Sequence, residues 1–379
     1  MKRFRFMKRL PGTFMGALET NTLGDPFKRT ASARTGASPA AKLAVIITCF
    51  NYEAFVERAI RSVLDQKCDA CELVVIDDGS TDCSWEAISR CGVKAFKIEN
   101  RGQLGACLYG LESTQAPFIL FLDADDELKP GSLTKLLDEL DERVAKVQFG
   151  LTLIDADGNA LGPFCSLDSF RDRDRVLDEV LGRGVYKTPP TSGNVFRRDL
   201  CELLREVNYD KAVDGVILFA APLFGDVVSL SEELGRYRVH GRNDSQLGQL
   251  PTAPLLERDM KRFAARTEHL RDIVRRLAPG RELIQPQQAF YYREREYCLE
   301  IVTGKARRST SVPKLLVGLL AEPYSPARKL AMAAFFVFGA FLPTRAAKAL
   351  LAIRSQGGHR SAKTYVRAIS GCFPKLTRE

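Results

Sequence analysis

Acidic side chains follow two of the most apolar segments of this 379-residue chain. Asp123 and Asp125 come directly after Phe118–Leu122, and Asp78 comes shortly after Leu73–Ile76. Two carboxylates one residue apart repel each other unless a positive group lies near them. Mg²⁺ or Mn²⁺ bridged to a diphosphate is a fitting partner, because these ions take a few carboxylates and complete their shell with phosphate oxygens. The Asp-Ala-Asp triplet therefore indicates a metal–diphosphate site, and the alternative is an acidic loop before a helix.

The second acidic cluster, Asp77–Asp82, contains the turn-forming sequence Gly-Ser-Thr. A carboxylate at such a turn can accept hydrogen bonds from a nucleotide base or from ribose hydroxyls. The alternative is a turn followed by a helix that Asp82 or Ser84 caps. We expect Asp78 to bind a ligand and Asp82 to act as a cap.

Residues 43–140 alternate short β-branched segments with stretches of helical periodicity. This alternation predicts an α/β fold with a Rossmann-like, mostly parallel sheet and helices on both faces. Ligands bind beyond the carboxyl ends of the strands in such sheets. The expected strands are 43–47, 73–76, 93–98 and 118–122, and the expected helices are 52–66, 85–91, 102–113 and 130–140. Polar clusters at the four strand ends predict one site, made of Thr48–Asn51, Asp77–Asp78, Asn100–Gly102 and Asp123–Asp126.

Four motifs in one order carry a family resemblance: Val45–Asn51, Val74–Asp82, Asn100–Gln103 and Phe121–Asp126. Together they make residues 43–137 resemble the donor-binding half of family 2 glycosyltransferases, which are inverting enzymes with the glycosyltransferase-A fold. One departure is Cys49, where the family usually has Pro or another small residue.

The resemblance implies roles for the donor-side residues. Thr48 and Asp78 would hold the nucleotide base, Asp123 would meet the ribose or the metal, and Asp125 would bind the metal on the diphosphate. The strand-end clusters add three more expected substrate-binding residues, which are Asn51, Asn100 and Gly102.

The resemblance continues to about residue 245. Thr191–Arg198 is similar to the family's acceptor-side segment, and Tyr209–Gly215 is similar to the segment with the catalytic base. Asp214 is the predicted base, and its alternative role is a carboxylate at a helix start. Because Val213 replaces the usual acidic neighbour, the other candidates are Asp210 and Asp226.

The last similar segment is Tyr237–Ser245, which contains an Arg-x-His sequence. In the family this segment folds over the diphosphate. The resemblance implies that His240 is a metal ligand and that Arg238 contacts a phosphate.

The implied function is that of an inverting, metal-dependent glycosyltransferase. It would move a sugar from a nucleotide-diphosphate donor, by default a UDP-sugar, to a hydroxyl of a glycan or lipid-linked acceptor. Mg²⁺ or Mn²⁺ would offset charge on the leaving diphosphate while Asp214 takes the acceptor proton. The alternatives are an inactive sugar-nucleotide-binding homologue and a sugar-phosphate nucleotidyltransferase, although Thr48–Ala54 lacks the Gly-rich phosphate loop that the latter would need.

The composition, with 45% hydrophobic and 27% charged residues, is typical of a globular enzyme and excludes collagen-like and fully disordered chains. Of the net charge of +9, residues 1–40 contribute +6 and residues 301–379 contribute +12, which leaves −9 between them. The acidic middle argues against a nucleic-acid partner. We expect three parts: a flexible basic arm over 1–40, a catalytic domain over 41–250 with donor and acceptor halves that meet near residue 140, and a basic helical region over 251–379.

Ten cysteines are scattered along the chain, and the Cys-x-x-Cys pair at Cys68 and Cys71 has no second pair near it. This pattern predicts reduced thiols and a cytoplasmic protein. Leu330–Leu342 is uncharged, flanked by basic residues and too short to span a bilayer. It is expected to lie peripherally on an anionic membrane surface at the inner face of the cell membrane, and the alternative is burial against the catalytic domain.

Overall fold

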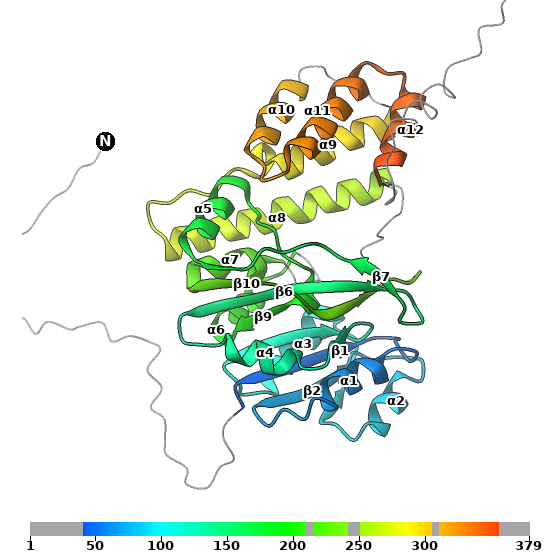
Figure 1. The fold of residues 1–379 in the computed structure, drawn as a ribbon, viewed down its shortest axis with the longest axis vertical. Helices are drawn as coiled ribbons and strands as arrows, with labels where there is room; N and C mark the ends of the chain where they lie inside the picture. Colours follow the sequence, from blue (N-terminus) through cyan, green and yellow to red (C-terminus); the bar gives the residue numbers. More distant parts are fainter. Residues whose placement is uncertain (1–40, 210–214, 242–250, 305–310, 356–379) are drawn as a thin grey trace, which may run out of the picture. The chain divides into compact units, whose positions relative to one another are not determined.

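The computed structural model describes residues 41–209, 215–241, 251–304 and 311–355. Its centre is a ten-stranded sheet in the order β3-β2-β1-β4-β9-β6-β10-β5, with β7 paired to β6 and β8 to β10 (Figure 1). The strands are β1 Leu43–Cys49, β2 Cys71–Asp77, β3 Ala95–Lys97, β4 Phe118–Asp123, β5 Glu127–Leu128, β6 Val144–Ile154, β7 Ala160–Pro163, β8 Phe170–Asp172, β9 Asn194–Arg197 and β10 Asp226–Arg238.

The first half of the sheet, β3-β2-β1-β4, is parallel throughout. The central strand β1 is apolar and buried on both faces, as expected for a strand covered by helices on either side. Thr48 lies in register with Ile76 on one neighbour and with Asp123 on the other. The carboxyl ends of β2, β1 and β4 are therefore level, and the polar residues that follow them meet at one edge.

The second half of the sheet is mixed, which differs from the mostly parallel sheet expected. β9 runs antiparallel to both β4 and β6, whereas β6 is parallel to β10. The alternation of strands and helices over residues 43–140 predicts a mostly parallel sheet, because parallel neighbours are joined by crossover helices, and it contains no signal for the antiparallel strand β9. The α/β class is nevertheless confirmed, with helices on both faces.

Alternate residues of β1 enter two separate cores. Ala44 and Ile46 face α3, α5, α6 and α7, whereas Val45 and Ile47 face α1, α2 and α4. This period of two places one helical layer on each side of the sheet. The helices are α1 Val56–Leu64, α2 Ser84–Arg90, α3 Gly102–Glu112, α4 Ser132–Asp138, α5 Asp174–Arg183, α6 Arg198–Cys201 and α7 Val216–Phe224.

Among the described residues after 250, every regular element is a helix, which agrees with the helical C-terminal region expected from the sequence. A third apolar core joins α9 to α10, α11 and α12, and α8 packs between α7 and α9 (Figure 1). The buried carboxylate of Glu322 pairs with Arg183 of α5. Within the described ranges, none of the helices combines the length and the apolar character needed to cross a membrane. The helices are α8 Ala253–Leu277, α9 Phe290–Thr303, α10 Ser311–Ala321, α11 Pro326–Phe341 and α12 Thr344–Ser355.

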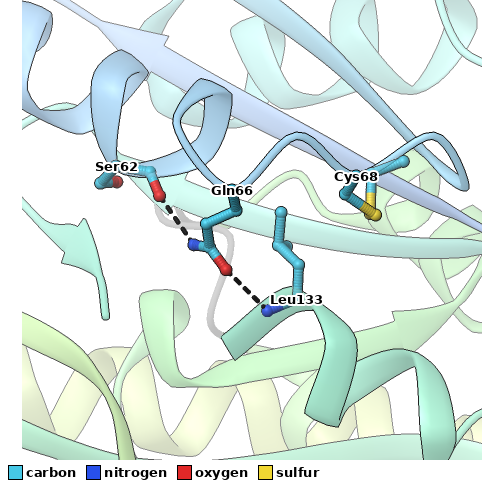
Figure 2. Close-up of a disulfide and its surroundings, with 5 residues drawn as sticks. Ser62, Gln66, Cys68 and Leu133 are labelled. Carbon is cyan, nitrogen blue, oxygen red and sulfur yellow. Dashed lines mark hydrogen bonds between the residues drawn. A yellow bond between two sulfur atoms is a disulfide. The ribbon is translucent and has the colours of Figure 1, made fainter. Parts of the chain in front are cut away.

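The structure joins Cys68 and Cys71 in a disulfide, with Cα atoms 5.4 Å apart (Figure 2). The expectation of reduced thiols is therefore wrong for this pair. The bridge links the loop after α1 to the first residue of β2. In the same region Gln66 accepts a hydrogen bond from the backbone N–H of Leu133 at 3.0 Å and donates one to the carbonyl of Ser62 at 2.7 Å, which ties α1 to α4.

We expect Gly110→Ala to lower the free energy of unfolding by about 2 kcal/mol, because a small-to-large change in a packed core is destabilising. A Cβ atom at this position of α3 would lie 2.3 Å from Cγ2 of Ile46. The matched control is Gly182→Ala in α5, where a Cβ would meet nothing within 4 Å. The control should stabilise the protein by about 0.5 kcal/mol through helix propensity. Urea unfolding measures both, and equal effects would contradict the close approach of α3 to β1.

Candidate active site

Asp78 connects the ends of three strands. Its backbone N–H donates to the carbonyl of Cys49 at 2.8 Å, and its Oδ1 accepts from the backbone N–H of Arg101 at 2.7 Å. The second bond brings the Asn100–Gly102 segment beside the end of β2. Gly79 allows this approach, because its φ is +76° and a Cβ there would lie 2.9 Å from the backbone nitrogen of Asn100. Thr48, Asp78 and the Asn100–Gly102 segment thus surround one place at the edge of the sheet.

Asn51 has a different role from the one expected. Its φ is 60°, a conformation in which Asn is tolerated. Its Oδ1 accepts a hydrogen bond from the backbone N–H of Thr81 at 2.8 Å, and its own N–H donates to Oγ of Ser80 at 3.0 Å. These bonds clamp the loop after β1 to the turn after β2. Substrate binding by Asn51 stays a prediction, whereas its clamping contacts are in the structure.

Asp123, at the end of β4, forms hydrogen bonds with residues of two different segments. Its Oδ1 accepts from Nε2 of Gln103 in the first turn of α3 at 2.7 Å. Its backbone N–H donates to Oγ of Ser192 at 3.2 Å. Ser192 belongs to the short turn before β9, within the segment expected on the acceptor side. Asp123 therefore lies where the segment expected on the donor side meets the segment expected on the acceptor side.

Asp125 and His240 come together although 115 residues separate them. Nε2 of His240 lies 2.9 Å from Oδ2 of Asp125, and both side chains are less than a tenth exposed. The imidazole stacks on Phe55 with ring centroids 5.1 Å apart, and the edge of Tyr52 faces it. The aromatic rings orient the imidazole toward the carboxylate. A carboxylate and an imidazole at one point can both serve as ligands of a divalent cation.

Arg238 lies under the acidic turn and is completely buried. Its Nε donates to the carbonyl of Asp125 at 2.9 Å, and one terminal nitrogen donates to the carbonyls of Asp155 and Ala156, each at 3.0 Å. The other terminal nitrogen pairs with the carboxylate of Glu127. The guanidinium is therefore occupied in fixing the turn, and the structure does not support the expected contact between Arg238 and a phosphate.

The carboxylates of the turn influence one another. Burial, followed by Asp125 and Asp123, raises the pKa of Asp126 well above its ordinary value. Oδ1 of Asp126 accepts the backbone N–H of Arg238 at 2.9 Å, which anchors the end of β10. Burial and the same two aspartates also raise the pKa of Tyr52. This negative field favours a cation at the turn.

The sequence is similar to one family. Residues 44–182 match the family described as glycosyl transferase family 2. An uncharacterized glycosyltransferase of Nostoc is 28% identical over 287 residues, which cover 70% of this chain and 87% of that protein. The GalNAc(5)-diNAcBac-PP-undecaprenol beta-1,3-glucosyltransferase of Campylobacter jejuni is 29% identical over 243 residues, covering 58% of this chain and 75% of that one. Residues 44–182 form a family 2 glycosyltransferase domain.

The fold of the chain also has matches among solved structures. The structure of Staphylococcus aureus TarS residues 1–349 with UDP-GlcNAc matches it with a TM-score of 0.50 at 15% identity, covering 87% of this chain and 91% of that one. The fold is that of glycosyltransferase-A enzymes, as the sequence motifs predict. The α/β fold is thus confirmed.

Two of the candidates for the catalytic base, Asp214 and Asp210, lie outside the described residues. The third, Asp226, is excluded by its position at the start of β10, paired with the start of β6 and far from the strand ends that form the site. Burial raises its pKa, but Arg171 and Arg143 outweigh that effect and hold the pKa below its ordinary value. Asp226 is therefore a structural ion-pair partner.

A buried lysine supports the acceptor-side segment of the glycosyltransferase. Lys146 of β6 donates to the hydroxyl of Tyr186 at 2.8 Å and to that of Thr188 at 2.6 Å, and Thr188 donates to Oδ1 of Asn194 at 3.2 Å. These contacts fix both ends of the segment that contains Ser192. Burial alone lowers the pKa of Lys146 well below its ordinary value, and within the described part of the chain it has no carboxylate partner.

Several of these contacts were not assigned from the sequence. Gln103 stands inside a recognised motif, so its type and position could have indicated the contact with Asp123. Tyr52 and Phe55 follow the polar turn after β1. Their sequence position is equally typical of aromatic residues in the hydrophobic core, so it does not indicate a contact with His240. The sequence does not indicate that Lys146 is buried, because a single lysine within a strand is expected to face solvent.

Replacing Arg238 tests its structural role. We expect Arg238→Met to lower the free energy of unfolding by about 3 kcal/mol, because it removes the buried cation of Glu127 and leaves buried carbonyl groups without their donor. The control is Arg236→Met, since Arg236 pairs with the same Glu127 but is 40% exposed and should cost less than about 1 kcal/mol. Urea unfolding measures both. Unchanged stability together with a raised KM for the donor would contradict this structural role and would support the contact between Arg238 and a donor phosphate that the sequence predicts.

The lysine network predicts a pH dependence. An unfolded Lys146 binds a proton up to about pH 10, whereas the folded one releases it at lower pH. The unfolded state therefore binds more protons between these limits, and stability rises with pH by up to about 1.4 kcal/mol per pH unit. In Lys146→Met this contribution should vanish. Urea unfolding of both proteins between about pH 7 and pH 9 measures the difference, and parallel curves would mean that Lys146 stays charged when folded.

Proposed function

We propose that this glycosyltransferase is inverting and metal-dependent, and that it moves a sugar from a nucleoside diphosphate donor to a hydroxyl of a glycan or lipid-linked acceptor. The observation that carries the proposal is the convergence of Asp78, Asp123, Asp125 and His240 on one edge of the sheet. The name of the Campylobacter relative, which describes a beta-1,3-glucosyltransferase for an undecaprenol-linked glycan, supports this acceptor class and the inverted linkage.

Asp125 and His240 would hold the metal. Their side chains already meet, and carboxylate oxygen with imidazole nitrogen suits Mn²⁺, with Mg²⁺ as the alternative. Among the described residues no group of three or more such side chains comes together. Two protein ligands fit a cation that shares its shell with a diphosphate. When bound, such an ion would offset the charge on the leaving group.

Each of the remaining residues has a role in this scheme. Thr48 and Asp78 would hold the base, with Asn100 and Gly102 beside it, and Asp123 would meet the ribose. UDP is the default nucleotide. Asp214 would take the proton of the acceptor hydroxyl as its oxygen bonds to the anomeric carbon. The bond from that carbon to the diphosphate oxygen breaks, its electron pair leaves with the nucleotide, and an α-linked donor gives a β-linked product.

A panel of sugar nucleotides with Mn²⁺ tests the proposal, with donor hydrolysis and binding as readouts. One donor should be turned over, and Asp125→Asn should lower that turnover at least about 100-fold, since a metal contributes several kcal/mol to charge stabilisation. The control is Asp69→Asn, an exposed carboxylate in the loop before β2. His240→Ala should raise the Mn²⁺ concentration required.

The catalytic base is tested separately. Asp214→Asn should retain donor binding while transfer to an acceptor is lost, because only the proton-accepting step is removed. A folded protein that binds no donor would contradict the proposal. Donor binding without hydrolysis or transfer under any condition would instead indicate an inactive homologue.

A further inference from the structure

Large apolar side chains are exposed on two neighbouring helices at the end of the chain's described part. Leu320 is 72% exposed, Leu330 73% and Phe341 77%. Of the nine large hydrophobic residues that are exposed among those described, six lie on α10 and α11. We call these six residues the outer face; they are Val317, Leu320, Leu330, Val337, Phe338 and Phe341.

The outer face is not needed to hold the helices together. The opposite side of α11 buries Phe335 and Phe336 against Tyr297 of α9, whose hydroxyl donates to the carbonyl of Phe336 at 2.7 Å. The inner side of α10 buries Leu315 and Leu319 in the same core. Each helix is therefore apolar on two sides, and only one side has a partner within the described residues.

Because of their helical spacing, exposed apolar residues lie on one side of each helix and form a stripe on α10 and another on α11. Val317 and Leu320 are three residues apart on α10, and Phe338 and Phe341 are three apart on α11. The two helices pack against each other, and both pack on α9, as their adjacent orange ribbons show (Figure 1). The two stripes thus face away from α9. A cluster of six large exposed apolar side chains on two neighbouring helices is typical of a docking site.

The exposed charges of the helices α10, α11 and α12 have one sign. Lys314, Arg328 and Lys348 are exposed on α10, α11 and α12. In residues 301–378 the only acidic residue is Glu322, and its buried carboxylate is paired with Arg183. The partner should therefore present negative charge next to an apolar layer. An anionic lipid surface has this combination, with phosphate headgroups above acyl chains.

The length of α11 determines its orientation relative to a lipid bilayer. Its 16 residues extend about 24 Å, less than the roughly 30 Å of a hydrocarbon core. We propose that the outer face of α10 and α11 docks in the plane of an anionic lipid bilayer, with its Phe and Leu side chains at the headgroup–acyl boundary and the Lys and Arg side chains on the headgroups. The alternative expected from the sequence, burial of this segment against the catalytic domain, differs from the structure, because the inner side of α11 packs in the third core with α9 and α10.

Vesicle co-sedimentation of the full chain tests this proposal. The vesicles are phosphatidylcholine alone and phosphatidylcholine mixed with phosphatidylglycerol. The protein should sediment with the anionic vesicles only, and added salt should weaken the partition. Phe338→Ser combined with Phe341→Ser should weaken it about tenfold for each phenylalanine. Lys348→Gln should weaken it about fivefold, because a basic residue near an anionic surface contributes about that factor.

The controls match the variants in residue type and exposure. Leu161→Ser, on β7, removes an apolar side chain that is 59% exposed, and Arg90→Gln, on α2, removes an exposed cation. Neither should change the partition. Thermal unfolding should show that all variants remain folded, since only exposed side chains change. Donor binding, measured in parallel, should be the same in all of them, so that this proposal can fail independently of the transfer reaction.

Three results would overturn the proposal. The first is no sedimentation with anionic vesicles, or equal sedimentation with neutral ones. The second is a double phenylalanine variant that partitions like Leu161→Ser. The third is light scattering that shows a lipid-free dimer which the double phenylalanine variant dissociates, because the outer face would then be covered by a second copy of this chain.

Discussion

The buried guanidinium of Arg238 lies under the acidic turn after β4, where three aspartates and Glu127 occur within five consecutive residues. It pairs with Glu127, which also pairs with the more exposed Arg236. The N–H groups of Arg238 also donate to the backbone carbonyl of Asp125 in this turn and to that of Asp155 in the loop after β6. Because Arg238 is the last residue of β10, that long strand positions the turn as well as His240, two residues further on. The positions of the acidic turn and of His240, which contacts Asp125, therefore both depend on the end of β10.

The donor side could be predicted from the sequence because its signals are local. Each parallel strand is a short apolar segment, and each is followed directly by its polar cluster, so the level carboxyl ends bring Thr48, Asp78 and Asp123 together. The helices that cover the sheet follow from periodicity in the same way. Their bounds differ by a few residues, as for α1, which begins at Val56 because the loop after β1 is clamped through Asn51.

The acceptor side could not be predicted to the same depth, because its contacts join distant segments. The pairing of β9 between β4 and β6 leaves no periodic mark in the sequence. The sequence shows Arg238 as a cation near an acidic motif, but burial decides whether a guanidinium binds carbonyls or a ligand. The same holds for Lys146, whose partners lie 40 and 42 residues away, and for the Cys68–Cys71 bridge.

The length of β10 has an evolutionary consequence. Its first residue, Asp226, is fixed by Arg143 and Arg171, and its last, Arg238, is fixed beneath the acidic turn. An insertion or deletion of one residue between these anchors would turn every later side chain to the other face of the sheet. The irregular pairing between Leu230 and Glu233 is the one place along its register with β6 where two strand residues already lack a partner. Related chains should therefore change length at that bulge or in the connecting loops, and keep the rest of the strand at constant length.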